Sequence, residues 1–207
     1  MVDNTLWGPR QPPEDKRAFG LLPNYRTAEA NVPFQSLTLK QKFSIATKDS
    51  IDYPVLLTTA FFAGISQSER SNSSVYGPGW KGFVYRYGIS YVDQVTSNYL
   101  PEAIIPALLH DDPRYFRKSD GSIRSRALYA IDHIFIGKTD TGATTFNAPE
   151  IVGNGLAAVA GLAYHSRERT PGAVLSEFGT LVTADMAGNI AKEFWPDLKS
   201  WYKNRRH

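Results

Sequence analysis

The sequence predicts an all-α fold, a single-domain bundle of about six helices preceded by an extended, proline-containing N-terminal arm. Side chains that can cap helices precede long apolar stretches, alternating strand patterns are almost absent, and no repeat or second domain is visible. With 207 residues, 42% of them hydrophobic, the chain is long enough for one sizeable core. We therefore divide it into the arm, residues 1–36, which we expect to lie on the domain, and the helical bundle domain, residues 37–207.

Composition excludes several classes of function. The formal net charge is only +3. The chain contains no cysteine, so disulfides, thiolate metal sites and cysteine nucleophiles are excluded. The chain starts without a basic region followed by an apolar run, so we expect no signal peptide. No apolar stretch reaches the length of a membrane-spanning helix. Phosphate-binding loops, dinucleotide fingerprints and serine nucleophile elbows are also missing from the sequence.

Two helices are expected at the start of the domain. Residues 38–41 read Thr-Leu-Lys-Gln, a capping box that starts a helix running to about Lys48. Asp49 or Ser50 then caps a second helix over residues 52–67. This second helix is apolar nearly all round, which predicts a buried element.

A third helix starts near Trp80 and is interrupted by prolines. We expect a bend at Pro101. Pro106 lacks the amide that would donate to the carbonyl of Glu102, so a kink should leave that acceptor free beside an acidic side chain. Pro113 should end the helix.

Three further helices are expected in the second half of the chain. They cover residues 123–136, 149–165 and 171–195, with a turn or short hairpin at residues 139–145 after the first. Each follows a side chain that can cap it, namely Ser122, Asn147 and Thr170. Pro196 should end the last helix.

Small residues recur every four positions on the last two helices. One stripe consists of Gly153, Ala157 and Gly161. The other consists of Gly172, Ser176, Thr180, Ala184 and Gly188. Because such stripes let backbones approach closely, we expect the two helices to form a tight antiparallel pair. Packing in a soluble core and membrane-associated or oligomeric packing both fit, although Asn154, Asp185, Lys192 and Glu193 argue against full insertion.

The densest group of ionisable residues gives the candidate catalytic site, Glu102, His110, Asp111 and Asp112. These side chains could bind a divalent metal or act as an acid and a base, although their spacing matches no known metal motif. A structural interpretation competes with this one. His110 would lie in the last helical turn, Asp112 would cap the next turn, and Arg114 would pair with an aspartate. Metal and cofactor content stay open.

Two other histidines are weaker candidates. His133 follows Asp132 within an apolar helix and His165 lies three residues before Glu168, so either could join a site across the bundle. A lone histidine is more often a structural residue with satisfied hydrogen bonds, and this alternative is retained for both.

Two tyrosines are candidate binding residues. Tyr87 and Tyr91 share one face of the third helix and could line a polar pocket with Glu102. An aromatic stripe of the core is the alternative.

A basic segment could bind anions. Its candidate binding residues are Arg114, Arg117, Arg124 and Arg126. With Tyr115 and Phe116 beside them, anionic lipid head groups or phosphates are plausible partners, and a solvated loop surface is the alternative. Nucleic acid is not expected as a partner, because no known binding motif accompanies the charge.

Four segments carry a resemblance to known proteins. They are residues 22–27 (Leu-Pro-Asn-Tyr-Arg-Thr), 41–49 (Gln-Lys-Phe-Ser-Ile-Ala-Thr-Lys-Asp), 110–117 (His-Asp-Asp-Pro-Arg-Tyr-Phe-Arg) and 193–197 (Glu-Phe-Trp-Pro-Asp). Together they resemble a family of uncharacterised cell-envelope proteins of soil bacteria, often made with an export signal, over residues 19–197. The resemblance implies a location in the cell envelope or periplasm and carries no activity, cofactor or catalytic residue.

The leading functional expectation is a non-catalytic envelope protein that associates with an anionic membrane surface or a protein partner through a basic and aromatic surface. A hydrolase or metal-dependent enzyme using Glu102, His110, Asp111 and Asp112 is the first alternative. This alternative fails if His110 points into solvent while Glu102 is paired elsewhere. A bundle that binds a small ligand or cofactor is the second alternative, and homo-oligomer formation is left open.

Overall fold

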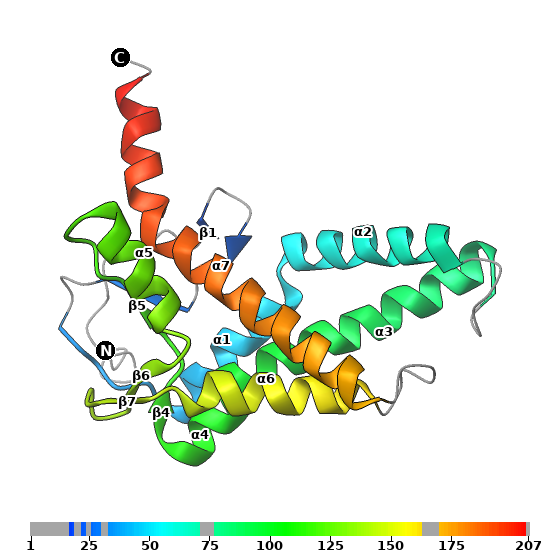
Figure 1. The fold of residues 1–207 in the computed structure, drawn as a ribbon, viewed down its shortest axis with the longest axis horizontal. Coiled ribbons are helices and arrows are strands. Elements are labelled where there is room, and N and C mark those ends of the chain that lie inside the picture. Colours follow the sequence, from blue (N-terminus) through cyan, green and yellow to red (C-terminus); the bar gives the residue numbers. More distant parts are fainter. Residues whose placement is uncertain are drawn as a thin grey trace, which may run out of the picture.

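A computed structural model of the chain describes residues 17–18, 22–23, 26–29, 33–70, 77–162 and 170–205 (Figure 1). The structure is mostly helical. Its helices are α1 (Leu39–Ile51), α2 (Tyr53–Arg70), α3 (Gly79–Tyr99), the π-helix η2 (Leu100–Ile104), α4 (Ile105–Leu109), α5 (Ile123–Asp132), α6 (Ala148–Gly161) and α7 (Pro171–Asn204). Because α3, η2 and α4 follow one another without a break, the described chain forms six helices, the number expected from the sequence.

Three small sheets accompany the helices. β1 (Arg17–Ala18) pairs with β2 (Leu22–Pro23), β3 (Thr27–Ala28) pairs in parallel with β5 (Tyr115–Phe116), and β4 (Asp111–Asp112), β6 (Ile136–Thr139) and β7 (Thr144–Phe146) form an antiparallel sheet. The expected hairpin is confirmed, with Ile136 opposite Phe146. The other strands were not predicted, because two-residue strands are too short to show an alternating pattern.

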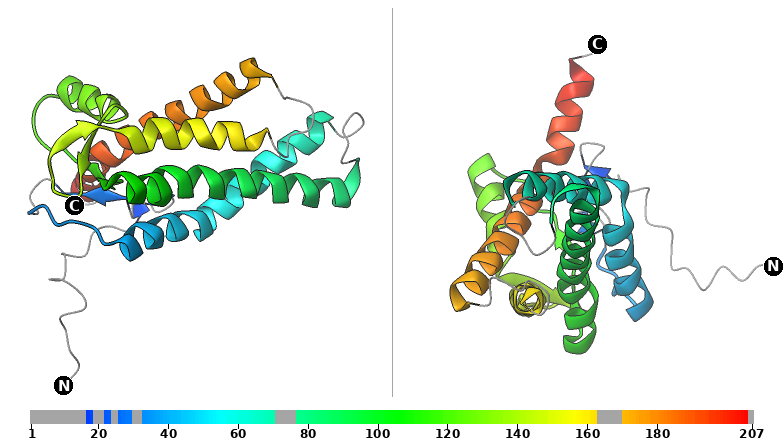
Figure 2. Two further views of the ribbon diagram at one scale, coloured as in Figure 1. Left: turned by 90° about the horizontal axis from the view of Figure 1, so that it is seen from below. Right: turned by 90° about the vertical axis from the view of Figure 1, so that its right-hand side faces the viewer.

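The elements are distributed along one long axis. Figures 1 and 2 show β4 to β7 and α5 at one end, and the α2–α3 hairpin reaching beyond α6 and α7 at the other. Between these ends, η2 packs against α1 and α6, while α7 packs against α6 and α5. The middle of the molecule is therefore the place where the largest number of helices meet.

The described part of the N-terminal arm is built into the domain. Thr27 and Ala28 are buried in β3, and the carbonyl of Arg26 accepts a hydrogen bond from the amide of Tyr115 at 2.8 Å. The amide of Arg117 donates to the carbonyl of Ala28 at 3.0 Å. This pairing places the side chain of Arg26 inside the bundle.

Most predicted helix starts are confirmed. Thr38 and Gln41 form both hydrogen bonds of the capping box, and Ser122 and Thr170 also cap their helices. Asn147 caps α6 by accepting a hydrogen bond from the amide of Glu150. The carboxylate of Glu150 does not take part in this cap and is buried in the interior. One capping prediction was wrong, because α1 continues to Ile51 and Asp52, not Asp49 or Ser50, accepts the first amide of α2.

The proline-rich helix adapts to its prolines by forming a π-helix. Pro101 and Pro106 cannot donate hydrogen bonds, and the amide of Ile105 instead bonds to the carbonyl of Leu100, five residues back. The helix ends at Leu109 and not at Pro113, because His110 adopts a left-handed conformation with φ of 58°. Glu102 thus lies on a widened turn in the middle of the molecule.

Two predicted helix ends also differ. α5 ends at Asp132, and the residues expected to complete it form a turn and β6. α7 continues past Pro196 to Asn204. Pro196 has no amide for the carbonyl of Lys192, but Arg117 donates its Nε to that oxygen at 2.7 Å, which satisfies the acceptor that the proline leaves unpaired.

The small-residue stripes do not pack against each other as predicted. The stripe of α6 is buried, and a Cβ on Gly153 would lie 2.6 Å from the Cα of Pro101, so this stripe contacts η2 at Gly153. In the stripe of α7, residues 172, 176, 180 and 184 are exposed. The close backbone contact that the stripes predicted therefore joins α6 to η2.

Candidate functional site

Six charged side chains meet where the arm, α1, η2, α6 and α7 come together. This charge cluster consists of Arg26, Asp49, Glu102, Glu150, Asp185 and Lys192. Arg26 lies at its centre. Its guanidinium donates to Glu102 Oε1 at 3.4 Å, to Glu150 Oε2, and through Nε to the carbonyl of Pro113 at 2.7 Å.

The four carboxyl groups of the charge cluster form two pairs. Asp49 lies beside Glu102, and Glu150 lies beside Asp185, so that each carboxyl group acts on the pKa of its neighbour. Asn154 Nδ2 also donates to Asp185 Oδ2 at 2.7 Å. Within the described residues, Asp49 Oδ1 and Glu102 Oε2 are buried and accept no hydrogen bond from any N–H or O–H donor.

Burial changes the charge states of these groups. Burial, together with the neighbouring Asp49, raises the pKa of Glu102 well above its usual value. Burial and Glu150 raise the pKa of Asp185 to about 8. Burial would also raise the pKa of Glu150, but Arg26 outweighs it and lowers that pKa. The cluster thus combines one ionised carboxylate with neighbours that favour the protonated form.

Burial also acts on the remaining two groups of the charge cluster. It raises the pKa of Asp49, despite the opposing effect of Lys192. It lowers the pKa of Lys192, and the positive charge of Arg26 adds to this effect.

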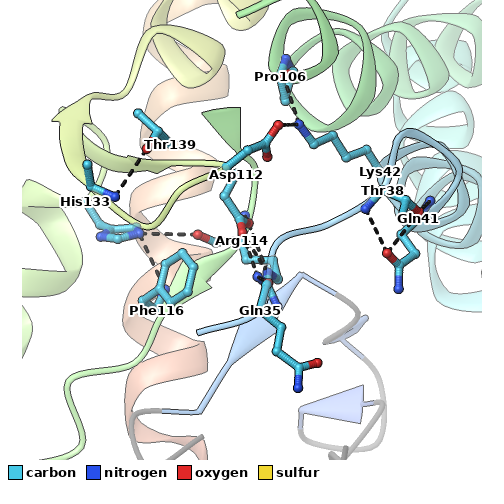
Figure 3. Close-up of polar contacts among 12 residues, drawn as sticks. Gln35, Thr38, Gln41, Lys42, Pro106, Asp112, Arg114, Phe116, His133 and Thr139 are labelled. Atoms are coloured by element: carbon cyan, nitrogen blue, oxygen red, sulfur yellow. Dashed lines mark hydrogen bonds and ion pairs between the residues drawn. The ribbon is translucent and has the colours of Figure 1, made fainter. Parts of the chain in front are cut away.

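The predicted catalytic residues do not form one site. Glu102 is buried and paired with Arg26, whereas His110 is exposed at the end of α4. Asp112 bonds to Arg114 through its side chain and to the amide of the same residue at 3.0 Å, as the structural interpretation predicted (Figure 3). Asp111 lies near Asp140, which together with burial raises its pKa. These four side chains therefore do not converge in the described structure, and the hypothesis that they form an active site stays a prediction.

Three of the four predicted arginines are buried in ion pairs. Arg114 pairs with Asp112, Arg117 with Glu29, and Arg126 with Glu193 and Asp197. Arg124 is exposed. The expected basic surface is therefore not formed by these arginines, whose positive charges are neutralised inside the fold.

Glu193 forms a second buried site that sequence analysis did not identify. Its carboxylate accepts hydrogen bonds from Tyr115 Oη and Arg126 Nε, both at 2.8 Å, and from the amides of Lys118 and Ser119 at 2.9 Å. Burial would raise the pKa of Glu193, but these donors outweigh it and lower the pKa. A charged residue next to Phe-Trp in a helix was the available signal, and it does not reveal the partners.

The predicted tyrosines belong to an aromatic series along α3. Tyr87 and Tyr91 stack with ring centroids 6.3 Å apart, and Phe83 and Trp80 extend the series toward the start of the helix. The hydroxyl of Tyr91 donates to the carbonyl of Ser50 at 3.3 Å. This arrangement agrees with an aromatic stripe between helices.

A cleft of about 160 Å³ lies between α3, α6 and α7. It is lined by residues that include Asp93, Ser97, Ala157, Gly161 and Glu177. Pockets for drug-sized ligands usually measure about 300–1,000 Å³. This cleft is smaller than that range, and the hypothesis of a bundle that binds a small ligand or cofactor stays a prediction.

The histidine predictions have separate outcomes. His133 is buried, with its ring 4.8 Å from that of Tyr115 and its Nε2 near the amide of Phe116 (Figure 3). Burial lowers the pKa of His133 to about 4, so it is a neutral core residue at neutral pH. His165 lies outside the described residues. In the part of the chain that the structure covers, no three His, Asp or Glu side chains are placed to hold a metal ion.

α2 is apolar as predicted, but it is not buried. Its large side chains face outward and form an apolar face made of Tyr53, Leu57, Phe61, Phe62 and Ile65. The side toward α3 carries smaller residues, with Thr59 and Ala63 only 6% and 0% exposed. Among the described helices, none is both long and apolar enough to cross a bilayer.

Comparisons with protein families, curated proteins and solved structures found no match to this chain. The resemblance to envelope proteins therefore stays a prediction, and function has to be argued from the residues themselves.

Proposed function

We propose that this protein is a non-catalytic cell-envelope protein that associates with a membrane surface through the apolar face of α2. The observation that carries the proposal is the exposure of Phe61 and Phe62, 65% and 63%, on a helix whose buried side carries the small residues Thr59 and Ala63. The resemblance to envelope proteins supports the location.

The orientation of α2 is the reverse of the usual one. An amphipathic helix at the surface of a soluble domain turns its large apolar side chains toward the core. α2 turns Thr59 and Ala63 toward the core and its phenylalanines outward. Burying a phenylalanine side chain contributes about 1.5–3 kcal/mol, so covering this face would be favourable.

The position of the apolar face favours a lipid surface as the covering partner. The far part of the α2–α3 hairpin projects beyond the ends of α6 and α7, so these two helices do not cover it (Figure 1). Trp80 is exposed at the start of α3, with exposed Lys81 next to it. Tryptophan and lysine beside an apolar helix face are typical of helices that lie in a membrane interface.

This proposal changes the surface that was expected to bind. The arginines of the basic segment are mostly paired in the interior, so charge attraction to them is a weak basis for association. Apolar insertion of α2 does not depend on those arginines. We therefore expect binding that resists added salt, because screening weakens charge attraction but not apolar burial.

Vesicle co-sedimentation tests the proposal. Wild-type protein should sediment with phosphatidylcholine vesicles as well as with vesicles containing phosphatidylglycerol. Replacing both phenylalanines (Phe61→Ser with Phe62→Ser) should weaken partitioning by at least about tenfold. Leu175→Ser is the matched control, because Leu175 is 71% exposed on α7, outside the apolar face.

Two results would overturn the proposal. One is no sedimentation of the folded wild-type protein with either kind of vesicle. The other is a wild-type dimer in solution that the double variant converts to a monomer while vesicle binding is absent, since the face would then bind a second copy.

A further inference from the structure

We infer that the charge cluster is a proton-binding site that holds two protons at neutral pH, one shared by Asp49 and Glu102 and one shared by Glu150 and Asp185. This inference is independent of the proposed membrane association. It concerns a site that connects the arm, α1, η2, α6 and α7.

Hydrogen-bond chemistry favours a proton in each pair. An ionised carboxylate is an acceptor only, so two neighbouring carboxyl groups can bond to each other only if one of them carries a proton. Asp49 lies beside Glu102, and Glu150 lies beside Asp185. In the pair of Asp49 with Glu102, one oxygen of each side chain is buried without a donor among the described residues, and a shared proton supplies it.

Charge balance points to the same number of protons. Four ionised carboxylates with Arg26 and Lys192 would leave two uncompensated negative charges in the interior, a costly arrangement. Two protons remove this excess and leave the cluster neutral. The high pKa of Asp185, about 8, agrees with a proton held there at neutral pH.

The charged and titratable groups facing the cluster come from every element around it. They are Arg26 of the arm, Asp49 and Asp52 at the end of α1, Glu102 of η2, His133 after α5, Glu150 of α6, and Asp185 and Lys192 of α7. Asp52 accepts the amide of Tyr53, and His133 is neutral above its pKa of about 4. Neither neighbour supplies a positive charge that would replace the shared protons.

The consequence is a fold whose centre is sensitive to alkali. A carboxyl group with a raised pKa contributes stability that is present below its usual value and is lost as pH rises through the raised one. For Asp185 this window runs from 3.8 to about 8. Deprotonation would place like charges between helices, so α1 and the arm should be held less tightly at alkaline pH.

Counting protons released on unfolding tests the inference. Urea unfolding of the full chain at neutral pH in weak buffer should release about two protons per molecule, because unfolded carboxyl groups are ionised there. Glu102→Gln and Asp185→Asn, which imitate the protonated groups, should each reduce the release by about one proton. Asp120→Asn, at an exposed position, should leave it unchanged.

Infrared spectroscopy gives a second readout on the folded protein. We expect the carbonyl band of a protonated carboxyl group at neutral pH, reduced in both variants and lost at alkaline pH. Absence of the band, or release of no protons on unfolding, would overturn the inference. Unfolded Glu102→Gln and Asp185→Asn proteins would also count against it, because an amide should replace a protonated carboxyl group without loss of the fold.

Discussion

The buried carboxyl groups of Glu193 and Glu102 lie in two regions of the same bundle and have opposite chemistry. Glu193 has no exposed surface, and its carboxylate receives donors from Tyr115, Arg126 and two backbone amides. Glu102 is 5% exposed and shares Arg26 with Glu150. The pKa of Glu193 is lowered, while that of Glu102 is raised.

The difference shows that donors, not burial, decide the charge state. Burial alone raises the pKa of both groups, because it disfavours the charged form. Glu193 overcomes this effect with four hydrogen-bond donors. Glu102 has one long contact to a cation that a second carboxylate also uses, so a proton is its best partner. Glu193 therefore anchors the loop at Lys118 and Ser119 as an anion.

The largest difference in the free energy of unfolding should be seen between variants that remove the carboxyl group of Glu193 and that of Glu102. Glu193→Ala leaves Arg126 without its buried partner and should lower the free energy of unfolding at neutral pH by about 3–5 kcal/mol. Glu102→Gln should lower it by less than about 1 kcal/mol, because the amide imitates a protonated carboxyl group. Urea denaturation followed by circular dichroism measures both.

The destabilisation caused by Glu193→Ala should be smaller at acidic pH. The stability that Glu193 contributes is present above its usual pKa of 4.5 and is lost as pH falls through its lowered value. The deficit of Glu193→Ala should therefore shrink in acid. Equal losses for Glu193→Ala and Glu102→Gln at neutral pH would contradict the comparison.

A smaller effect is expected from the contact that positions Glu102. Gly153→Ala should destabilise the protein by about 1–3 kcal/mol, because its Cβ would meet the backbone of Pro101 at 2.6 Å. Gly155→Ala on the same helix is the control. No heavy atom lies within 4 Å of that position, so alanine should stabilise α6 by up to about 1 kcal/mol. Relative to the wild type, the melting temperature should fall for Gly153→Ala and rise for Gly155→Ala. If both changes shift it in the same direction, the contact between α6 and η2 is not as tight as the structure shows, because η2 has moved to accommodate the added Cβ.

The smallest expected effect is a change in pH dependence. The melting temperature of the wild-type protein should fall as pH rises from mildly acidic to mildly alkaline, because Asp185 has a pKa of about 8. Asp185→Asn should show a flatter profile over the same range and approach or exceed the wild type at its alkaline end. Parallel profiles for the two proteins would contradict the assignment of a bound proton to this pair.

Local chemistry made much of the helical pattern predictable. Thr38, Ser122 and Thr170 cap helices with side chains that act within three residues, so their partners are visible in the sequence. The pair of Asp112 with Arg114 was predictable for the same reason. Pro196 was wrongly expected to end α7, because Arg117, which compensates for the missing amide, comes from 75 residues away.

The sequence by itself determined where most of the helices begin, that the fold is mostly helical, and that Glu102 lies at a proline-disturbed turn. Tertiary structure decided which side of α2 faces outward and which charges share the interior. Arg26 reaches Glu102 and Glu150 across 76 and 124 residues of chain, and no local pattern indicates such partners. The charge of a buried group depends on the donors that the fold brings to it, and those donors are known only once the helices have packed.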